Sequence, residues 1–148
     1  MKKRILMDNN NSNISVSKSF LGRGWKFPVT FVDSSFTVEL VEDELDIAES
    51  IQIILNTTLG ERVMHPDFGA NLEDLLFEKI DITTLTMITN RLKRAFLYHE
   101  SRVRIDDIDL TPDIENGIIQ VTVNYTVSAT NTRTNLVYPY YINEGTDI

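Results

Sequence analysis

The chain has 148 residues, 42% of them hydrophobic and 24% charged, which is the size and composition of one ordinary globular domain. It contains no cysteine, which excludes a disulfide scaffold, a zinc–thiolate site and a cysteine nucleophile. The net charge of -8 disfavours binding to nucleic acid and to anionic membranes. No apolar run is long enough to span a membrane, and the apolar stretch at the N-terminus is too short for a signal peptide.

The first part of the chain reads as a tail followed by an extended segment. Residues 1–19 are expected to be a flexible tail, because they include a run rich in Asn and Ser that cannot build a core. Residues 20–29 are aromatic and interrupted by glycine and proline, which indicates an extended segment that either completes this protein's own sheet as a strand or inserts into a neighbouring protein. Phe36, Val38 and Leu40 alternate with polar residues and predict a short, half-buried strand.

An amphipathic helix is predicted over residues 43–59. Its apolar residues recur three and four positions apart, as on one face of a helix: Ile47, Ala48, Ile51, Ile54, Leu55 and Leu59. Asp43 is a plausible N-cap, with Asp46 in the place of the capping-box acid. Gly60 stands where a helix C-terminal cap belongs.

A loop over residues 60–69 and a short capped helix over residues 71–78 follow. A second long helix is predicted over residues 82–100, and its apolar stripe consists of Leu85, Ile88, Leu92, Ala95, Phe96 and His99. Cationic side chains gather in its C-terminal half, where they interact favourably with the helix dipole.

The last third of the chain predicts β structure. The alternation of apolar residues changes parity at the pair Asp106 and Asp107, which predicts a β-bulge. Asn116 and Gly117 form a strong hairpin signal, followed by a strand with regular alternation over residues 119–129. A third, aromatic strand over residues 136–142 contains a proline, which belongs at a sheet edge.

These elements predict an α+β fold. Two long amphipathic helices and a short one pack on a small, mostly antiparallel sheet with an open C-terminal edge strand. Residues 20–148 are expected to form a single domain, within which residues 134–148 form the edge strand and tail.

Three features in this order resemble the GPW-type baseplate wedge family. They are the run FLGRGWKFP (residues 20–28), an amphipathic helix, and the run LGERVMHPDFG (residues 59–69). The family includes the T-even phage wedge protein once labelled a lysozyme and a baseplate subunit of type VI secretion. His65 departs from the pattern, because a basic residue such as arginine is common at that position.

The resemblance implies a sheath initiator in the baseplate of a contractile tail or injection particle. Its implied partners are the sheath protein, baseplate wedge proteins and central hub or tube proteins, with six copies per baseplate. The sheath would be initiated by strand pairing, and assembly would take place in the cytoplasm. The resemblance implies no cofactor.

The candidate partner-binding residues fall on three segments. The loop supplies Glu61, Arg62, His65, Pro66, Asp67 and Phe68, and the alternative is that it is a plain connector between helices. Trp25 has the composition of an interface anchor, but lone tryptophans are often core residues. Tyr138, Tyr140 and Tyr141 lie on the predicted edge strand, whose free backbone groups invite pairing by a partner strand.

Enzymatic activity, metal binding and DNA binding have weaker support in the sequence. A murein hydrolase needs two carboxyl groups in different environments, and acidic residues are too common here to mark a pair; the candidates are Glu42, Glu44, Glu49, Glu61, Asp67 and Asp74. No catalytic motif is present, and two histidines make a poor case for a metal site. A basic strip favours an acidic protein neighbour over DNA; it consists of Arg91, Lys93, Arg94, Arg102 and Arg104. A free-standing adaptor remains a further alternative.

Overall fold

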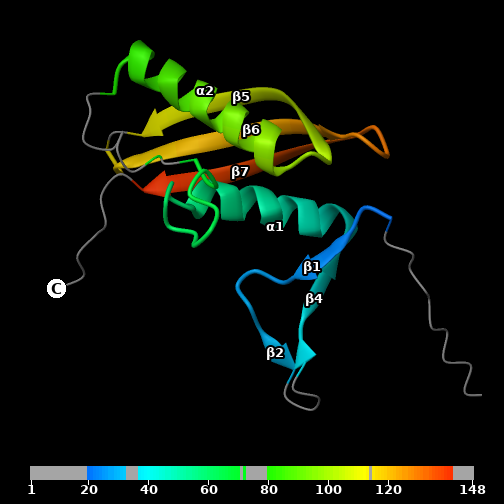
Figure 1. The fold of residues 1–148 in the computed structure, drawn as a ribbon. Coiled ribbons are helices and arrows are strands. Elements are labelled where there is room, and N and C mark those ends of the chain that lie inside the picture. Colours follow the sequence, from blue (N-terminus) through cyan, green and yellow to red (C-terminus); the bar gives the residue numbers. More distant parts are fainter. Residues whose placement is uncertain (1–19, 33–36, 71, 73–79, 114, 142–148) are drawn as a thin grey trace, which may run out of the picture.

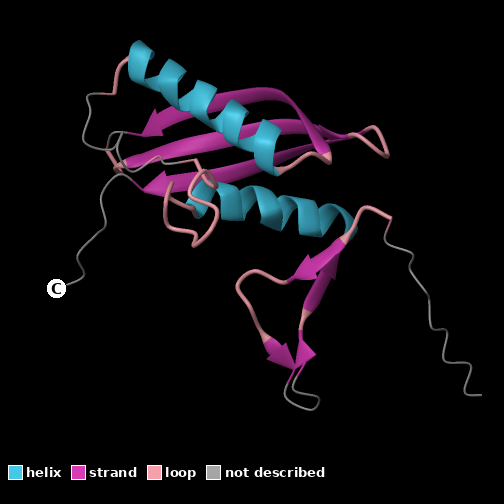
Figure 2. Ribbon diagram, in the orientation of Figure 1, coloured by secondary structure: helices cyan, strands magenta, loops and turns pink. Residues whose placement is uncertain are grey.

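The structure is a computed structural model that describes residues 20–32, 37–70, 72, 80–113 and 115–141. The predicted tail at residues 1–19 lies outside this part of the chain. In chain order the elements are β1 (Arg23–Trp25), β2 (Phe31–Val32), β3 (Thr37–Val38), β4 (Leu40–Glu42), α1 (Asp43–Asn56), α2 (Ile82–His99), β5 (Val103–Asp113), β6 (Ile118–Val127) and β7 (Thr132–Tyr141). Figures 1 and 2 show the two helices beside a sheet, with β1 to β4 as a separate projection.

The main sheet has the order β5-β6-β7, and both strand pairs are antiparallel. The pairing of β5 with β6 shifts register between Ile105 and Asp107, which confirms the predicted bulge. Gly117 adopts a left-handed conformation with φ of 63° in the β5–β6 connection, as the hairpin signal requires. β7 begins at Thr132, earlier than predicted, and extends to Tyr141.

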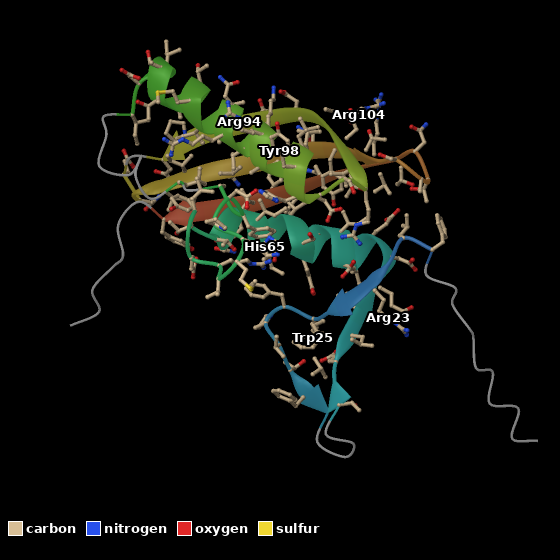
Figure 3. The ribbon with its side chains drawn as sticks, viewed as in Figure 1. Arg23, Trp25, His65, Arg94, Tyr98 and Arg104 are labelled. Atoms are coloured by element: carbon tan, nitrogen blue, oxygen red, sulfur yellow. The ribbon has the colours of Figure 1, made fainter. Side chains whose placement is uncertain are left out.

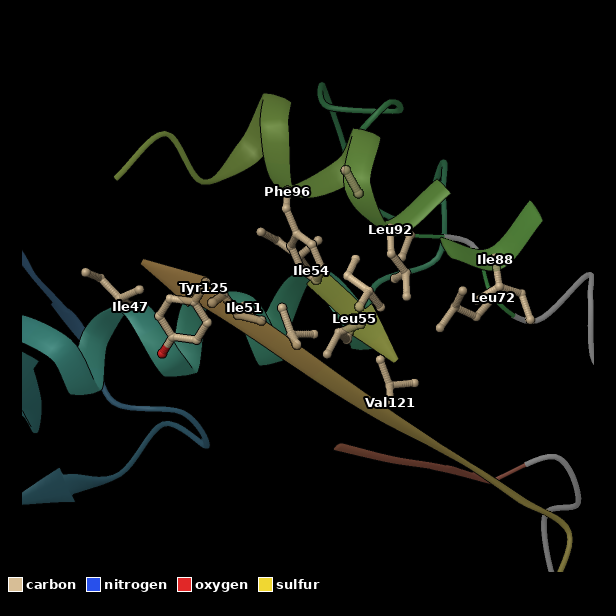
Figure 4. Packing of buried hydrophobic residues seen from close by; sticks show 14 of the residues in the cluster. Ile47, Ile51, Ile54, Leu55, Leu72, Ile88, Leu92, Phe96, Val121 and Tyr125 are labelled. Atoms are coloured by element: carbon tan, nitrogen blue, oxygen red, sulfur yellow. The ribbon is translucent and has the colours of Figure 1, made fainter. Parts of the chain in front are cut away.

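The core lies on one face of this sheet. The alternate β6 residues Ile119, Val121, Val123, Tyr125 and Val127 are all buried and therefore point the same way. Figure 4 shows α1 and α2 directing side chains toward them; the buried helix residues are Ile47, Ile51, Ile54 and Leu55 on α1 and Ile88, Leu92, Ala95 and Phe96 on α2. Each fully buried large side chain contributes about 1.5–3 kcal/mol through the hydrophobic effect.

The ends of α1 differ from the sequence prediction. Its N-cap is Glu42, whose side chain makes no capping hydrogen bond, and Asp43 is the first helical residue, with φ of 61°. Asp46, expected in a capping box, instead binds Arg102, so a tertiary ion pair replaces the local cap. The helix ends at Asn56, because Thr57 turns to an extended conformation and its carbonyl accepts a hydrogen bond from the Ala70 N–H.

The bounds of α2 agree closely with the prediction. Asp81 is its N-cap, and its carboxylate accepts a hydrogen bond from the Thr84 N–H at 2.8 Å. The Glu100 N–H donates to the Phe96 carbonyl at the other end. Because Thr84 rather than Leu85 is buried, the packed face begins one residue earlier than predicted.

The predicted fold class was wrong in its elements, although the fold is mixed α and β. The described residues contain two helices, and their strands form three antiparallel sheets rather than one. The residues before α1 pair with one another, β1 with β4 and β2 with β3, instead of joining the main sheet. The short helix expected at residues 71–78 falls, except for Leu72, outside the described residues.

Candidate partner-binding surfaces

The loop over residues 60–69, called the docking loop from here, is closed by its own backbone. The Gly60 N–H donates to the Pro66 carbonyl at 2.9 Å, and the Ala70 N–H donates to the Thr57 carbonyl at 3.1 Å. Gly69 has φ of 113°, and a Cβ at this position would lie 2.2 Å from the Thr57 carbonyl oxygen. Only glycine therefore allows the chain to return so closely to the end of α1.

Side-chain contacts fix the docking loop to the last turn of α2. The Arg62 guanidinium lies 3.8 Å from the centre of the Phe68 ring, and the Phe68 and His99 ring centres are 4.8 Å apart. His99 Nε2 lies 2.9 Å from the Asp67 carbonyl oxygen. Glu61 accepts a hydrogen bond from the Thr58 N–H. The loop is thus held in one conformation by contacts within the chain, so a partner that binds it would not bear the entropic cost of ordering it.

The outer side of the docking loop is exposed. His65, Pro66 and Asp67 are exposed, and Val63 and Met64 have exposed fractions of 88% and 89%. Figure 3 shows His65 on this loop, away from the main sheet. Two large apolar side chains at a loop tip contribute nothing to the core and are typical of a contact surface.

A groove of about 680 Å³ separates the docking loop from the C-terminal half of α2. We call it the α2 groove; its walls are Leu59, Pro66, Asp67, Gly69 and Ala70 on the loop side and Arg91, Arg94, Ala95, Tyr98 and His99 on the helix side. Three of the predicted site residues, Pro66, Asp67 and Phe68, therefore lie at or beside a concave surface. The sequence did not reveal this groove, because it depends on how the loop folds back.

β7 forms one edge of the main sheet, and no described strand pairs with its outer side. Tyr138 and Tyr140 are half-buried against the core, and the Tyr138 hydroxyl donates to the Asn56 side-chain oxygen. Tyr141 is 61% exposed. The three predicted tyrosines thus divide: two face the core of the chain itself, and one faces solvent.

Trp25 lies on the projection formed by β1 to β4, far from the docking loop in sequence. Its side chain, labelled in Figure 3, is 67% exposed, and Phe27 and Phe31, which follow it in the sequence, are 42% and 70% exposed. The Phe27 N–H donates to Glu49 on α1, which ties the projection to the helix. Trp25 is therefore not a core residue.

Arg102 occupies an ion-pair cluster that sequence reasoning missed. Its guanidinium binds Asp46 on α1 at 2.5 Å and Glu100 at 2.6 Å, and donates to the Leu21 carbonyl at 3.1 Å. Burial acts to raise the pKa of Glu100, but hydrogen bonds from Arg102 and Ser50 and the Arg102 charge outweigh it and lower that pKa. The carboxylates in turn raise the pKa of Arg102, chiefly through the Glu100 hydrogen bonds. No local motif connects positions so far apart in sequence.

Within the described ranges, no group of three or more His, Cys, Asp or Glu side chains could hold a metal ion. No helix in that part of the chain is both long and apolar enough to cross a membrane.

Comparison with known proteins shows similarity in both sequence and fold. The family model for baseplate wedge protein gp25 matches residues 41–132, whereas no curated protein matches the chain. A Geobacter sulfurreducens protein described as a candidate tail lysozyme is 43% identical, with a TM-score of 0.66 over 74% of this chain and 100% of that chain. A chain of the six-fold symmetrised baseplate of the anti-feeding prophage is 26% identical, with a TM-score of 0.61 over 84% and 89%. A chain of the postcontracted pyocin R2 baseplate is 16% identical, with a TM-score of 0.48 over 79% and 99%.

The family match covers more than half of the chain, and the Geobacter sulfurreducens protein is related to it over most of its length. These findings confirm the resemblance that the sequence runs indicated. The chain therefore belongs to the family of baseplate wedge protein gp25, a structural component of contractile tail particles.

Proposed function

We propose that this chain is a non-enzymatic sheath initiator in the baseplate of a contractile tail or injection particle. The docking loop and helices bind wedge proteins and hub or tube proteins, and the free edge of β7 pairs with a strand of the sheath protein. The related chain in a six-fold symmetrised baseplate supports six copies per particle. Assembly takes place in the cytoplasm, and a single domain of residues 20–148 carries both functions.

The observation that carries the proposal is the outer edge of β7. Pro139 lies opposite Gln120 and has no N–H to donate to β6, so its position faces the free edge. Backbone groups alternate between the two sides of an antiparallel strand, so Val137 and Asn135 also direct their N–H groups outward. An added strand can pair with these groups, and its ladder would be interrupted at Pro139.

Initiation at a fixed edge explains how a sheath could begin in only one place. A strand edge that is held on a baseplate adds no ordering cost when the first sheath subunit binds. The first ring then inherits the register and symmetry of the baseplate. A template must also be held in a constant orientation, and the rigid docking loop would hold the chain in that way on the baseplate.

The carboxyl groups with shifted pKa values in the described part of the chain take part in structural contacts. A glycosidase acid needs a pKa raised above its ordinary value. Every carboxyl group with a shifted pKa in the described part of the chain shifts downward through hydrogen bonds or ion pairs; these are Glu39, Asp81, Glu100, Asp106 and Asp113. None of them is among the predicted hydrolase candidates, of which Asp74 lies outside the described residues, and the hydrolase alternative rests on the description of the Geobacter sulfurreducens relative.

Proline substitution tests the free edge. Asn135→Pro with Val137→Pro removes two outward N–H groups while the bonds to β6 remain. We expect baseplates that contain the chain but have no sheath, as seen by electron microscopy. The matched control, Asn135→Ala with Val137→Ala, keeps both N–H groups and should assemble normal sheath.

The fold of each variant is checked by circular dichroism and thermal unfolding of the purified chain. Normal sheath on baseplates that contain the folded proline variant would refute strand pairing at β7. Release of murein fragments by the purified chain, above the level of a heat-unfolded sample, would establish the hydrolase alternative instead.

A further inference from the structure

The helix side of the α2 groove is a strip of regularly spaced residues. Arg91, Arg94, Ala95 and Tyr98 are three or four positions apart and therefore share one face over about two turns of α2. Figure 3 shows Arg94 and Tyr98 on this helix. A strip of this length along a helix matches the contact of a second helix that lies in the groove.

The groove combines an apolar floor with an exposed apolar rim. Ala70 and Ala95 are buried beneath it, whereas Leu59 and Tyr98 have exposed fractions of 45% and 73%. Large apolar side chains at the rim of a concave surface are typical of a protein contact, because they lose water when a partner covers them.

The positive charge on the helix side of the groove favours a partner with negatively charged side chains. Arg91 and Arg94 line the groove of a chain whose net charge is -8. Among the described residues Arg94 forms no ion pair, whereas Arg23, Lys26, Arg102 and Arg104 do. Asp67 lines the opposite side, so the attraction for an anionic group is strongest along α2.

We propose that the α2 groove binds an amphipathic helix of a neighbouring baseplate protein that carries acidic side chains beside its apolar face. The inference rests on the proposed function, since it names the chemistry of the partner that the docking loop and α2 meet. Apolar side chains of the helix enter between Leu59 and Tyr98. Its carboxylates pair with Arg94, whose guanidinium can donate two parallel hydrogen bonds to a carboxylate.

The test places a photo-crosslinking amino acid at Tyr98 in the full-length chain and irradiates assembled particles. We expect a cross-link to one acidic, helical segment of another baseplate protein, identified by mass spectrometry. Arg94→Glu should lower the cross-link yield about tenfold, because it replaces attraction by repulsion. Lys93→Glu is the matched control: Lys93 is exposed on the same helix but does not line the groove, and the yield should be unchanged.

A second variant separates a specific pair from a general loss of structure. Replacing the cross-linked acid of the partner by lysine should restore the yield with Arg94→Glu. Any of four results would overturn the proposal: no cross-link at Tyr98, a cross-link to another copy of this chain, a cross-link to a basic or non-helical segment, or equal losses from Arg94→Glu and Lys93→Glu. If one of these results is found but the particles contain the chain and form sheath, the groove proposal fails and the proposed function still stands. If the wild-type chain is absent from baseplates, the proposed function itself is refuted.

Discussion

Replacing Arg102 by Met is expected to destabilise the fold strongly. The change leaves the Glu100 carboxylate, whose side chain is 4% exposed, without its cation, and it removes the cation from Asp46, whose side chain is 14% exposed. Breaking a buried ion pair from one side costs about 3–5 kcal/mol, and the 30% exposure of the Arg102 side chain places the cost near the lower end. For a chain of this length, a loss of about 3 kcal/mol lowers the melting temperature by about 6–12 °C.

The destabilisation should depend on pH. In the native chain the pKa of Glu100 lies below its ordinary value of 4.5, so its contribution to stability is present above pH 4.5 and is lost as the pH falls through the lowered pKa. In the Arg102→Met variant the main cation is gone, and burial then raises the pKa of Glu100. Protonation removes the unpaired buried charge, so the difference in unfolding free energy between native and variant chains should shrink as the pH falls from 7 toward 4.

The assay is urea unfolding followed by circular dichroism at several pH values between 7 and 4. Lys93→Met is the control, since it removes an exposed cation and should change the unfolding free energy by less than about 0.5 kcal/mol. Combining Glu100→Gln with Arg102→Met should recover part of the loss, because the more deeply buried of the two carboxylates is then replaced by an uncharged amide. A loss below about 1 kcal/mol, or one that does not vary with pH, would refute the reasoning.

Three further predictions concern single positions. Phe96→Ala empties a fully buried site and should lower the free energy of unfolding by about 3–5 kcal/mol in urea titrations; a loss below about 1 kcal/mol would contradict the packing. Gly69→Ala would place a Cβ 2.2 Å from the Thr57 carbonyl oxygen, so the docking loop should exchange its amide hydrogens faster, and unchanged exchange would contradict this geometry. Asp81→Ala removes the cap of α2 and should lower the melting temperature at pH 7. Because the hydrogen bond from the Thr84 N–H lowers the pKa of Asp81, that difference should disappear as the pH falls well below 3.8, and a pH-independent difference would argue against the cap.

Gly60→Ala is the control for the Gly69 prediction. Gly60 also has a left-handed conformation, with φ of 85°, but a Cβ there would have nothing within 4 Å. The substitution therefore carries the backbone cost alone, about 1 kcal/mol, without a clash.

The sequence alone determined those elements whose signals are local. The alternation along β6, the parity change before Asp107 and the glycine at position 117 each depend on neighbouring residues, so the hairpin and its bulge could be predicted. The apolar stripe of α2 likewise follows from a helical period that needs no tertiary information. The sequence runs at residues 20–28 and 59–69, with the helix between them, were sufficient to indicate the family.

The tertiary structure decided what depends on distant contacts. Asp46 has the spacing of a capping-box acid, but its carboxylate pairs with Arg102, which is 56 residues away in the sequence, and the N-cap of α1 is Glu42. The strands before α1 pair with each other rather than with the main sheet, a choice that alternation cannot encode because it fixes faces and not partners. The α2 groove exists because Gly69 lets the docking loop approach Thr57, which brings Pro66 and Asp67 opposite Arg94. Local patterns specify which face of an element is buried, and packing among distant elements specifies which surfaces remain for partners.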